Sequence, residues 1–87
     1  MDTDLQDGKS RVVGTKQLLK QLAAGRIKTI YLASDAQAHI RDRLLSLAQE
    51  KNISVVEVET MKRLGQMCGI AVGSAAAGLL KEAGNLL

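Results

Sequence analysis

The residues best suited to binding chemistry are two lysines, Lys16 and Lys20, on a helix predicted from Thr15 to about Ala24. Gln17 lies on the same side of this helix, and the opposite side is an apolar stripe of Leu18, Leu19 and Leu22. Two like charges one turn apart destabilise an isolated helix by about 0.2–0.5 kcal/mol, and an anion would relieve that repulsion. Since the start of a helix carries partial positive charge, this segment indicates a phosphate-facing edge. The alternative is a plain solvated face, which is common on surface helices.

Basic residues are concentrated in one part of the chain. The run between positions 9 and 28 contains no acid and six basic residues, which are Lys9, Arg11, Lys16, Lys20, Arg26 and Lys28. The first seven residues carry three aspartates, and the chain after Lys28 has equal numbers of acidic and basic residues. The formal net charge is +3, with a pI of about 9.3. A local basic patch of this kind is typical of a protein that binds nucleic acid.

The composition excludes several classes of protein. At 87 residues the chain has room for one small domain. Tyr31 is the only aromatic among Phe, Trp and Tyr, which excludes RNA-binding modules that stack bases on several aromatic rings. Cys68 is the only cysteine, so neither an intramolecular disulfide nor a cysteine-rich zinc site can form, and we expect a reducing cytoplasm. The acidic N-terminus argues against a signal peptide.

Helix and strand patterns alternate along the chain, which predicts an α/β sandwich. Residues 1–9 are acidic and poor in apolar groups, so we expect a disordered N-terminal tail followed by one domain at 10–87. The predicted strands cover residues 11–13, 28–33, 53–58 and 74–80. The predicted helices cover residues 15–24 and 36–51, a short segment after Thr60 that includes Met61, Leu64 and Met67, and a tail that starts at Lys81.

Certain residue types mark where the helices begin and end. Thr15, Asp35 and Thr60 are each placed to cap the helix that follows. For Asp35 this interpretation is favoured over a role as a catalytic acid. Gly25 and Asn52 tolerate a left-handed backbone, and we expect them to end the first two helices.

The segment from Leu64 to Leu80 is seventeen residues long without a charge, with glycines at 65, 69, 73 and 78. A transmembrane helix is the less favoured interpretation, because seventeen residues is the lower limit for spanning and the composition is weakly apolar. A glycine-shaped loop followed by a buried strand explains the segment better.

Four segments of this chain resemble the kink-turn RNA-binding ribosomal protein family of the L7Ae and L30e type, particularly its short bacterial members. They are Val13–Lys20, Ala33–Ala36, Met61–Gly65 and Cys68–Gly73, and the resemblance extends over about residues 11–80. It implies a three-layer α/β/α sandwich with a mixed four-stranded sheet. In that fold the start of the first helix and the glycine-flanked loop face the RNA from two sides.

The resemblance also implies which residues contact RNA. The family segment that reads tandem sheared G·A pairs at the kink matches Gly14, Thr15, Lys16, Gln17 and Lys20. The family loop that rests on a splayed nucleotide matches Ile70, Ala71 and Val72, and Lys62 matches a basic position near the RNA backbone. Guanine O6 and N7 are acceptors that suit a lysine, and a glutamine amide can both donate and accept.

This chain departs from the family pattern at two places. Many members have Asn-Glu where this sequence has Lys16-Gln17, and an acid is frequent at the position of Gln37. The loss of a carboxylate acceptor changes the base contacts that Gln17 and Gln37 can make.

Together these observations predict a non-enzymatic RNA-binding protein that recognises and stabilises kink-turn RNA. The alternative is a protein-interaction or regulatory module of the same fold with little specific RNA affinity. An enzyme that uses Cys68 and His39 is less favoured, because a lone cysteine in an apolar segment is usually a small core residue. No P-loop, zinc-ligand cluster or dinucleotide fingerprint is present in the sequence.

The resemblance implies a ribosomal or ribosome-associated ribonucleoprotein. We expect its RNA partner to be ribosomal RNA or a structured mRNA leader. We further expect a cytoplasmic monomer without a catalytic residue, a metal site, a cofactor or a membrane partner.

Overall fold

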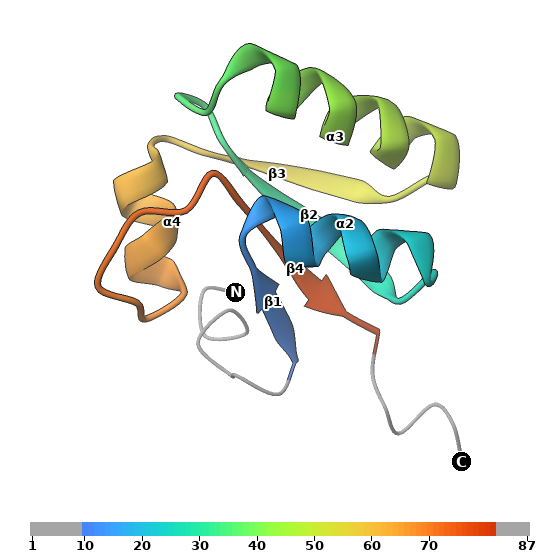
Figure 1. Ribbon diagram of the computed structural model, residues 1–87, viewed down its shortest axis with the longest axis horizontal. Helices are drawn as coiled ribbons and strands as arrows, with labels where there is room; N and C mark the ends of the chain where they lie inside the picture. Colours follow the sequence, from blue (N-terminus) through green and yellow to red (C-terminus); the bar gives the residue numbers. More distant parts are fainter. Residues whose placement is uncertain (1–9, 82–87) are drawn as a thin grey trace.

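The computed structural model describes residues 10–81 and contains seven elements of secondary structure in alternating order (Figure 1). The strands are β1 (Arg11–Val13), β2 (Ile27–Ala33), β3 (Ser54–Val58) and β4 (Ala76–Leu80). The helices are α2 (Thr15–Ala23), α3 (Ala38–Lys51) and α4 (Met61–Met67). The predicted tail at 1–9 and most of the tail helix predicted from Lys81 lie outside the described residues. None of the three described helices is long and apolar enough to cross a membrane.

The four strands form one mixed sheet in the order β1-β4-β2-β3. β2 and β3 are parallel, as expected for strands joined by a crossover helix, here α3. β4 is antiparallel to both β1 and β2, and so completes the centre of the sheet. The predicted mixed four-stranded sheet is therefore confirmed.

Two apolar cores lie on the two faces of this sheet. Neighbouring residues of β2 point to opposite faces, so Ile30 belongs to one core and Tyr31 to the other. The first core includes Leu18 of α2 and Leu44 of α3, whereas the second includes residues of α4 such as Leu64. The protein is thus the predicted three-layer sandwich, with α2 and α3 over one face and α4 over the other (Figure 1).

All three helices begin at the same edge of the sheet. β1, β2 and β3 end at this edge and β4 begins there, as the strand registers show. We call it the helix-start edge; it comprises Gly14 and the segments 34–37, 59–60 and 69–75. The opposite edge, where α2 and α3 end, is called the helix-end edge.

Two of the three predicted helix caps are wrong. Gly14, not Thr15, is the N-cap residue of α2, because the chain leaves β1 through a backbone conformation that only glycine adopts readily. Gln37 is the N-cap residue of α3, and Asp35 instead binds the start of α4. Thr60 caps α4 as predicted: its Oγ1 accepts a hydrogen bond from the Arg63 N–H at 3.0 Å.

The predicted helix ends are confirmed, whereas one strand is shorter than predicted. Gly25, with φ 72°, follows α2, and Asn52, with φ 57°, ends α3. β4 starts at Ala76 rather than at residue 74, because the Ser74 N–H donates to the Met61 carbonyl of α4 instead of to a neighbouring strand.

Candidate nucleic-acid interface

Gly14 shapes the start of α2. Its φ of 96° and ψ of 146° lie in a region that residues with side chains rarely adopt. Its N–H donates to the Ala76 carbonyl at 2.9 Å, and its own carbonyl accepts from the Leu18 N–H at 3.0 Å. Because glycine offers no capping side chain, the N–H groups of the first turn of α2 are not satisfied by the N-cap residue. They are available to an external anion.

The predicted contact residues of α2 face solvent. Lys16, Gln17 and Lys20 are exposed and Thr15 is half-buried, whereas Leu18 is fully buried beneath them. Packing against the sheet thus fixes which side of α2 is presented outward, and it is the side that carries the amide and ammonium groups.

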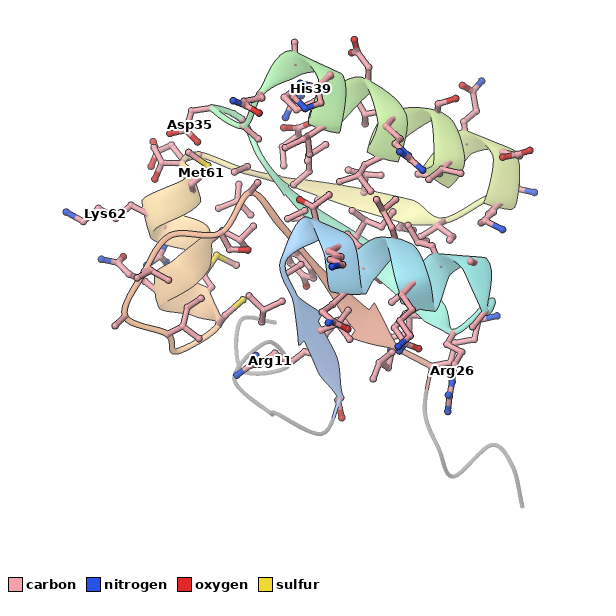
Figure 2. All side chains as sticks on the ribbon, viewed as in Figure 1. Arg11, Arg26, Asp35, His39, Met61 and Lys62 are labelled. Carbon is pink, nitrogen blue, oxygen red and sulfur yellow. The ribbon has the colours of Figure 1, made fainter. Side chains whose placement is uncertain are left out.

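The turn after β2 supports the start of α4. Oδ1 of Asp35 accepts a hydrogen bond from the Met61 N–H at 2.7 Å, across the helix-start edge. Together with the bond from Arg63 N–H to Thr60, this satisfies two of the otherwise unpaired N–H groups of α4. Asp35 is therefore a helix cap as expected, but for α4 rather than for α3. Lys62 is exposed on α4 and points away from the molecule (Figure 2).

The loop between α4 and β4 presents an apolar tip. Val72 is 70% exposed, the highest value among the exposed large apolar residues that the structure describes. Ala71 beside it is also exposed, whereas Ile70 is half-buried and packs against the core on the α4 face. The loop thus has one anchored residue and two that face solvent.

Close backbone packing holds this loop against α4. A Cβ on Gly65 would collide with the Val72 carbonyl oxygen, and a Cβ on Gly73 would lie 3.2 Å from the Met61 carbonyl carbon. The loop is tied at its start by the Ile70 N–H, which donates to the Gly65 carbonyl at 3.1 Å. The absence of a side chain at Gly65 therefore lets the Val72 backbone pack directly against α4, and this contact fixes the position of Val72.

Ser74 joins the loop to the start of α2. Its hydroxyl donates to the Ala76 carbonyl at 2.7 Å, and this oxygen also accepts the Gly14 N–H. The Ser74 side chain is buried, and its N–H donates to the Met61 carbonyl at 3.0 Å. The two predicted sides of the interface are therefore linked through one carbonyl oxygen, and Figure 1 shows the loop entering β4 beside the start of α2.

An ion pair braces the turn that holds Asp35. The Arg41 guanidinium donates to both carboxylate oxygens of Glu57 at 2.9 Å, and its Nη1 also donates to the Ala33 carbonyl at 3.0 Å. The Ser34 hydroxyl donates to Glu57 at 3.1 Å. The Arg41 hydrogen bonds lower the pKa of Glu57 below its ordinary value, and burial opposes this only in part. Glu57 therefore stays ionised, and the turn is fixed to the end of β3.

Gln37 lies at the helix-start edge, as the N-cap residue of α3. Its side chain is exposed and makes no capping hydrogen bond, while its backbone carbonyl accepts from the Ile40 and Arg41 N–H groups. The amide of Gln37 is therefore free to face a partner.

The basic run of the sequence does not form one patch. Lys16 and Lys20 lie on α2 with Lys62 on α4 beyond them, but Arg26 and Lys28 lie at the helix-end edge. Figure 2 shows Lys62 and Arg26 on opposite sides of the molecule. The prediction of a single local patch is wrong, because α2 carries the chain from Gly14 at the helix-start edge to Arg26 and Lys28 at the helix-end edge.

The structure does not bring Cys68 and His39 together. Cys68 is buried in the core beneath α4, where burial raises the pKa of its thiol, whereas His39 is exposed on α3 on the other side of the sheet. Among residues 10–81 no group of three or more His, Cys, Asp or Glu side chains could hold a metal ion.

Sequence reasoning missed Ser74, Arg41 and Glu57 as residues that position the site. Arg41 and Glu57 are separated by sixteen residues, so only the tertiary fold shows that they pair. A serine between a glycine and four small apolar residues was a possible signal of a buried hydroxyl with a local backbone partner.

The fold and the sequence agree with one known protein family. The pattern of the Ribosomal protein L7Ae/L30e/S12e/Gadd45 family matches residues 3–86. The chain belongs to this family. One relative is an RNA-binding protein from Caldanaerobacter subterraneus subsp. tengcongensis, 45% identical over 67 residues that cover 77% of this chain and 82% of the relative. RNA-binding protein YbxF from Geobacillus stearothermophilus is 40% identical over 77 residues, 88% of this chain and 93% of that protein.

Solved structures of other proteins have the same L7Ae-type fold. A Giardia lamblia 15.5kD RNA binding protein aligns with a TM-score of 0.82 at 23% identity, covering 98% of this chain and 72% of the other. A Bacillus halodurans protein with unknown function aligns with a TM-score of 0.79 at 26% identity, covering 92% and 79%. The family resemblance and the fold expected from it are confirmed.

Proposed function

We propose that this L7Ae-family protein is a non-enzymatic RNA-binding protein that recognises and stabilises kinked RNA containing tandem sheared G·A pairs. The observation that carries the proposal is the shared Ala76 carbonyl, which holds the start of α2 and the Val72 loop on one edge of the sheet. Relatives named as RNA-binding proteins support the proposal, as does the outward position of Lys16, Gln17 and Lys20.

The α2 side of the interface offers donors for an opened RNA groove. The major groove of regular A-form RNA is too deep and narrow for side chains, whereas a kink opens it. Lys16 and Lys20 can then donate to guanine O6 and N7, and Gln17 can pair with a neighbouring base edge. The N–H groups from Thr15 onward suit a phosphate at the start of the helix.

The loop side of the interface presents apolar side chains that can cover an unstacked base. Val72 and Ala71 can lie against a base that has left the stack, while Ile70 stays anchored in the core. Burying an aliphatic side chain under a base removes apolar surface from water without aromatic stacking. Lys62 in the first turn of α4 and Gln37 at the helix-start edge are both exposed. We propose that Lys62 contacts the backbone, and Gln37 a base edge, of the same RNA.

The proposal includes the location, the oligomeric state and the RNA partner of the protein. We place it in the cytoplasm as a monomer in a ribonucleoprotein, on ribosomal RNA or on a structured mRNA leader. Its proposed effect on the RNA is to shift the equilibrium toward the kinked form by binding that form better.

The test compares two RNAs that differ only at the kink. One contains the tandem G·A pairs, the other has Watson–Crick pairs in their place, and each is titrated at low and at high salt. We expect the wild-type protein to bind the kinked RNA at least about a hundredfold better, a difference of about 2.7 kcal/mol. The variant Lys16→Ala with Lys20→Ala should lose most of that preference.

A matched variant controls for net charge. Ser46→Glu with Gln49→Glu on the exposed side of α3 also lowers the net charge by two, and should keep the preference. Equal, weak and steeply salt-dependent binding to both RNAs would contradict the proposal, because it is the behaviour of a general phosphate attractor. The protein-interaction module would then be the better description.

A further inference from the structure

A second basic surface lies at the helix-end edge of the sheet. It is a hollow of about 430 Å³ lined by Gly25, Ile27, Lys28, Lys51, Asn52, Ile53 and Lys81. Three of these residues are lysines and none is acidic, so the hollow is strongly positive. We call it the basic hollow.

Two residues with left-handed backbone and one backbone hydrogen bond fix the chain around the basic hollow. Gly25 and Asn52 have left-handed conformations that end α2 and α3 and turn the chain back into β2 and β3. The Lys81 N–H donates to the Arg26 carbonyl at 2.9 Å and holds Lys81 beside the start of β2. The three lysines therefore come from three separate segments that the fold brings to one place.

A β-bulge places the first of these lysines. Ile27 pairs with Leu80 of β4 and Thr29 pairs with Leu79, so Lys28 is an extra residue with no counterpart on β4. Bulges bend a strand and re-aim its side chains, and they are frequent beside functional sites. Lys28 is exposed although both of its neighbours on β2 are buried or half-buried.

Helix stabilisation explains only part of this arrangement. A lysine in the last turn of a helix offsets the partial negative charge of the helix end, and Lys51 does this for α3. Lys28 is on β2 and Lys81 follows β4, so neither has such a role. Among the described residues the structure gives no ion pair to any of the three. The neighbouring Glu50 does not line the hollow; it lines a groove between α2 and α3, which Lys51 also borders.

We propose that the basic hollow binds the phosphate backbone of an RNA stem that runs away from the kink. The inference rests on the proposed function, because the RNA bound at the helix-start edge supplies that stem. The two edges are separated by the length of β2, whose seven residues span about 20 Å at roughly 3.3 Å each. A stem of sufficient length reaches the hollow, whereas a short stem ends before it.

The experiment varies the length of the RNA stems and, in the protein, the number of lysines in the basic hollow. The kinked RNA is prepared with both stems cut short, and again with either stem extended by one helical turn. These RNAs are titrated with the wild type, with Lys28→Gln/Lys81→Gln, and with the charge-matched control Ser46→Glu/Gln49→Glu. Thermal unfolding of each variant checks that it is folded at the titration temperature. If the double variant does not fold, Lys51→Gln on the exposed surface of α3 takes its place.

We expect the hollow variant to lose affinity only for the RNA whose extended stem reaches the basic hollow. On that RNA the hollow variant should bind about tenfold or more weakly than the wild type. The slope of log K against log salt should fall by nearly two, since each lost phosphate contact removes about 0.9. On the short RNA the hollow variant and the control should agree within about twofold.

Two results would overturn the inference while leaving the proposed function intact. One is a wild type that prefers the kinked RNA but gains no affinity from either longer stem. The other is a hollow variant that loses no more affinity on the extended RNAs than the control does. If the wild type has no preference for the kinked RNA, the proposed function fails and the inference fails with it.

Discussion

The Gly14 N–H donates to the Ala76 carbonyl at 2.9 Å, and this bond joins two parts of the chain that carry different halves of the interface. The same carbonyl accepts the Ser74 hydroxyl at 2.7 Å, so it fixes the end of the Val72 loop as well. A change at either side should therefore disturb contacts made by the other.

Replacing Gly14 by alanine should weaken both folding and RNA binding. A side chain at φ 96° and ψ 146° is strained by about 1–3 kcal/mol, although no atom outside the neighbouring residues lies within 4 Å of the new Cβ. The backbone will relax by rotating the first turn of α2, which moves Lys16 and the open N–H groups. We expect a loss of at least about tenfold in affinity for the short kinked RNA, measured by titration at a temperature where the variant is folded.

Gly25 provides the matched control for this change. It also has a positive φ, 72°, and open space around its Cβ, but it follows α2 at the opposite edge. Gly25→Ala should cost about 1–2 kcal/mol of unfolding free energy and leave affinity for the short kinked RNA unchanged. Equal losses of affinity in the two variants would mean that stability alone controls binding.

Replacing Gly65 by alanine should displace the Val72 loop. Alanine is the better helix former by about 1 kcal/mol, which favours α4 itself. The new Cβ would nevertheless collide with the Val72 carbonyl, so the loop must move, at a net cost of about 1–3 kcal/mol. Affinity for kinked RNA should fall while the salt dependence stays the same, because no lysine is lost.

A change in salt slope would identify a different cause for the Gly65 effect. It would show that the lysines of α2 had moved as well as the loop. Amide hydrogen exchange offers a second measurement, since the Ile70 N–H bond to the Gly65 carbonyl should lose protection when the loop shifts.

The order of elements followed from local signals in the sequence. The spacing of apolar residues distinguished the buried leucines of α2 from its exposed lysines. Asn52 ends α3 in a left-handed conformation and Thr60 caps the start of α4, as their residue types predict. The exposed positions of Lys16 and Gln17 also agreed with the sequence, because helical periodicity decides them.

Contacts between distant segments could not be predicted in this way. Asp35 was expected to cap the next helix, since a cap is normally a neighbour, but the turn after β2 places it beside Met61 instead. The division of the basic run between two edges also depends on the fold, because α2 carries the chain across the sheet from one edge to the other. Sequence distance is a poor guide to spatial distance in a sheet whose strand order is β1-β4-β2-β3.

Replacing Val72 by serine should affect binding without affecting the fold. The side chain is 70% exposed, so the substitution should change the unfolding free energy by less than about 0.5 kcal/mol. If Val72 covers an unstacked base, the loss of its apolar contact should weaken binding about three- to tenfold, measured by titration with the kinked RNA. Val56→Ser is the control, because Val56 is also exposed, at 41%, but lies on the edge strand β3.

The ion pair between Glu57 and Arg41 should make stability depend on pH in the acid range. Because the hydrogen bonds from Arg41 lower the pKa of Glu57 in the folded protein, the pair contributes its full stabilisation above the ordinary glutamate pKa of about 4.3. That contribution is lost as the pH falls from there through the lowered pKa of the folded state.

Urea unfolding of the wild type and of Glu57→Gln between pH 7 and pH 3 measures this contribution. The wild type should be the more stable of the two by a constant amount above about pH 5, and the difference should disappear toward the acid end. A difference that persists unchanged at pH 3 would mean that glutamine disrupts the turn for reasons other than charge. Since the turn carries Asp35, the variant should also show faster amide exchange at Met61 at neutral pH.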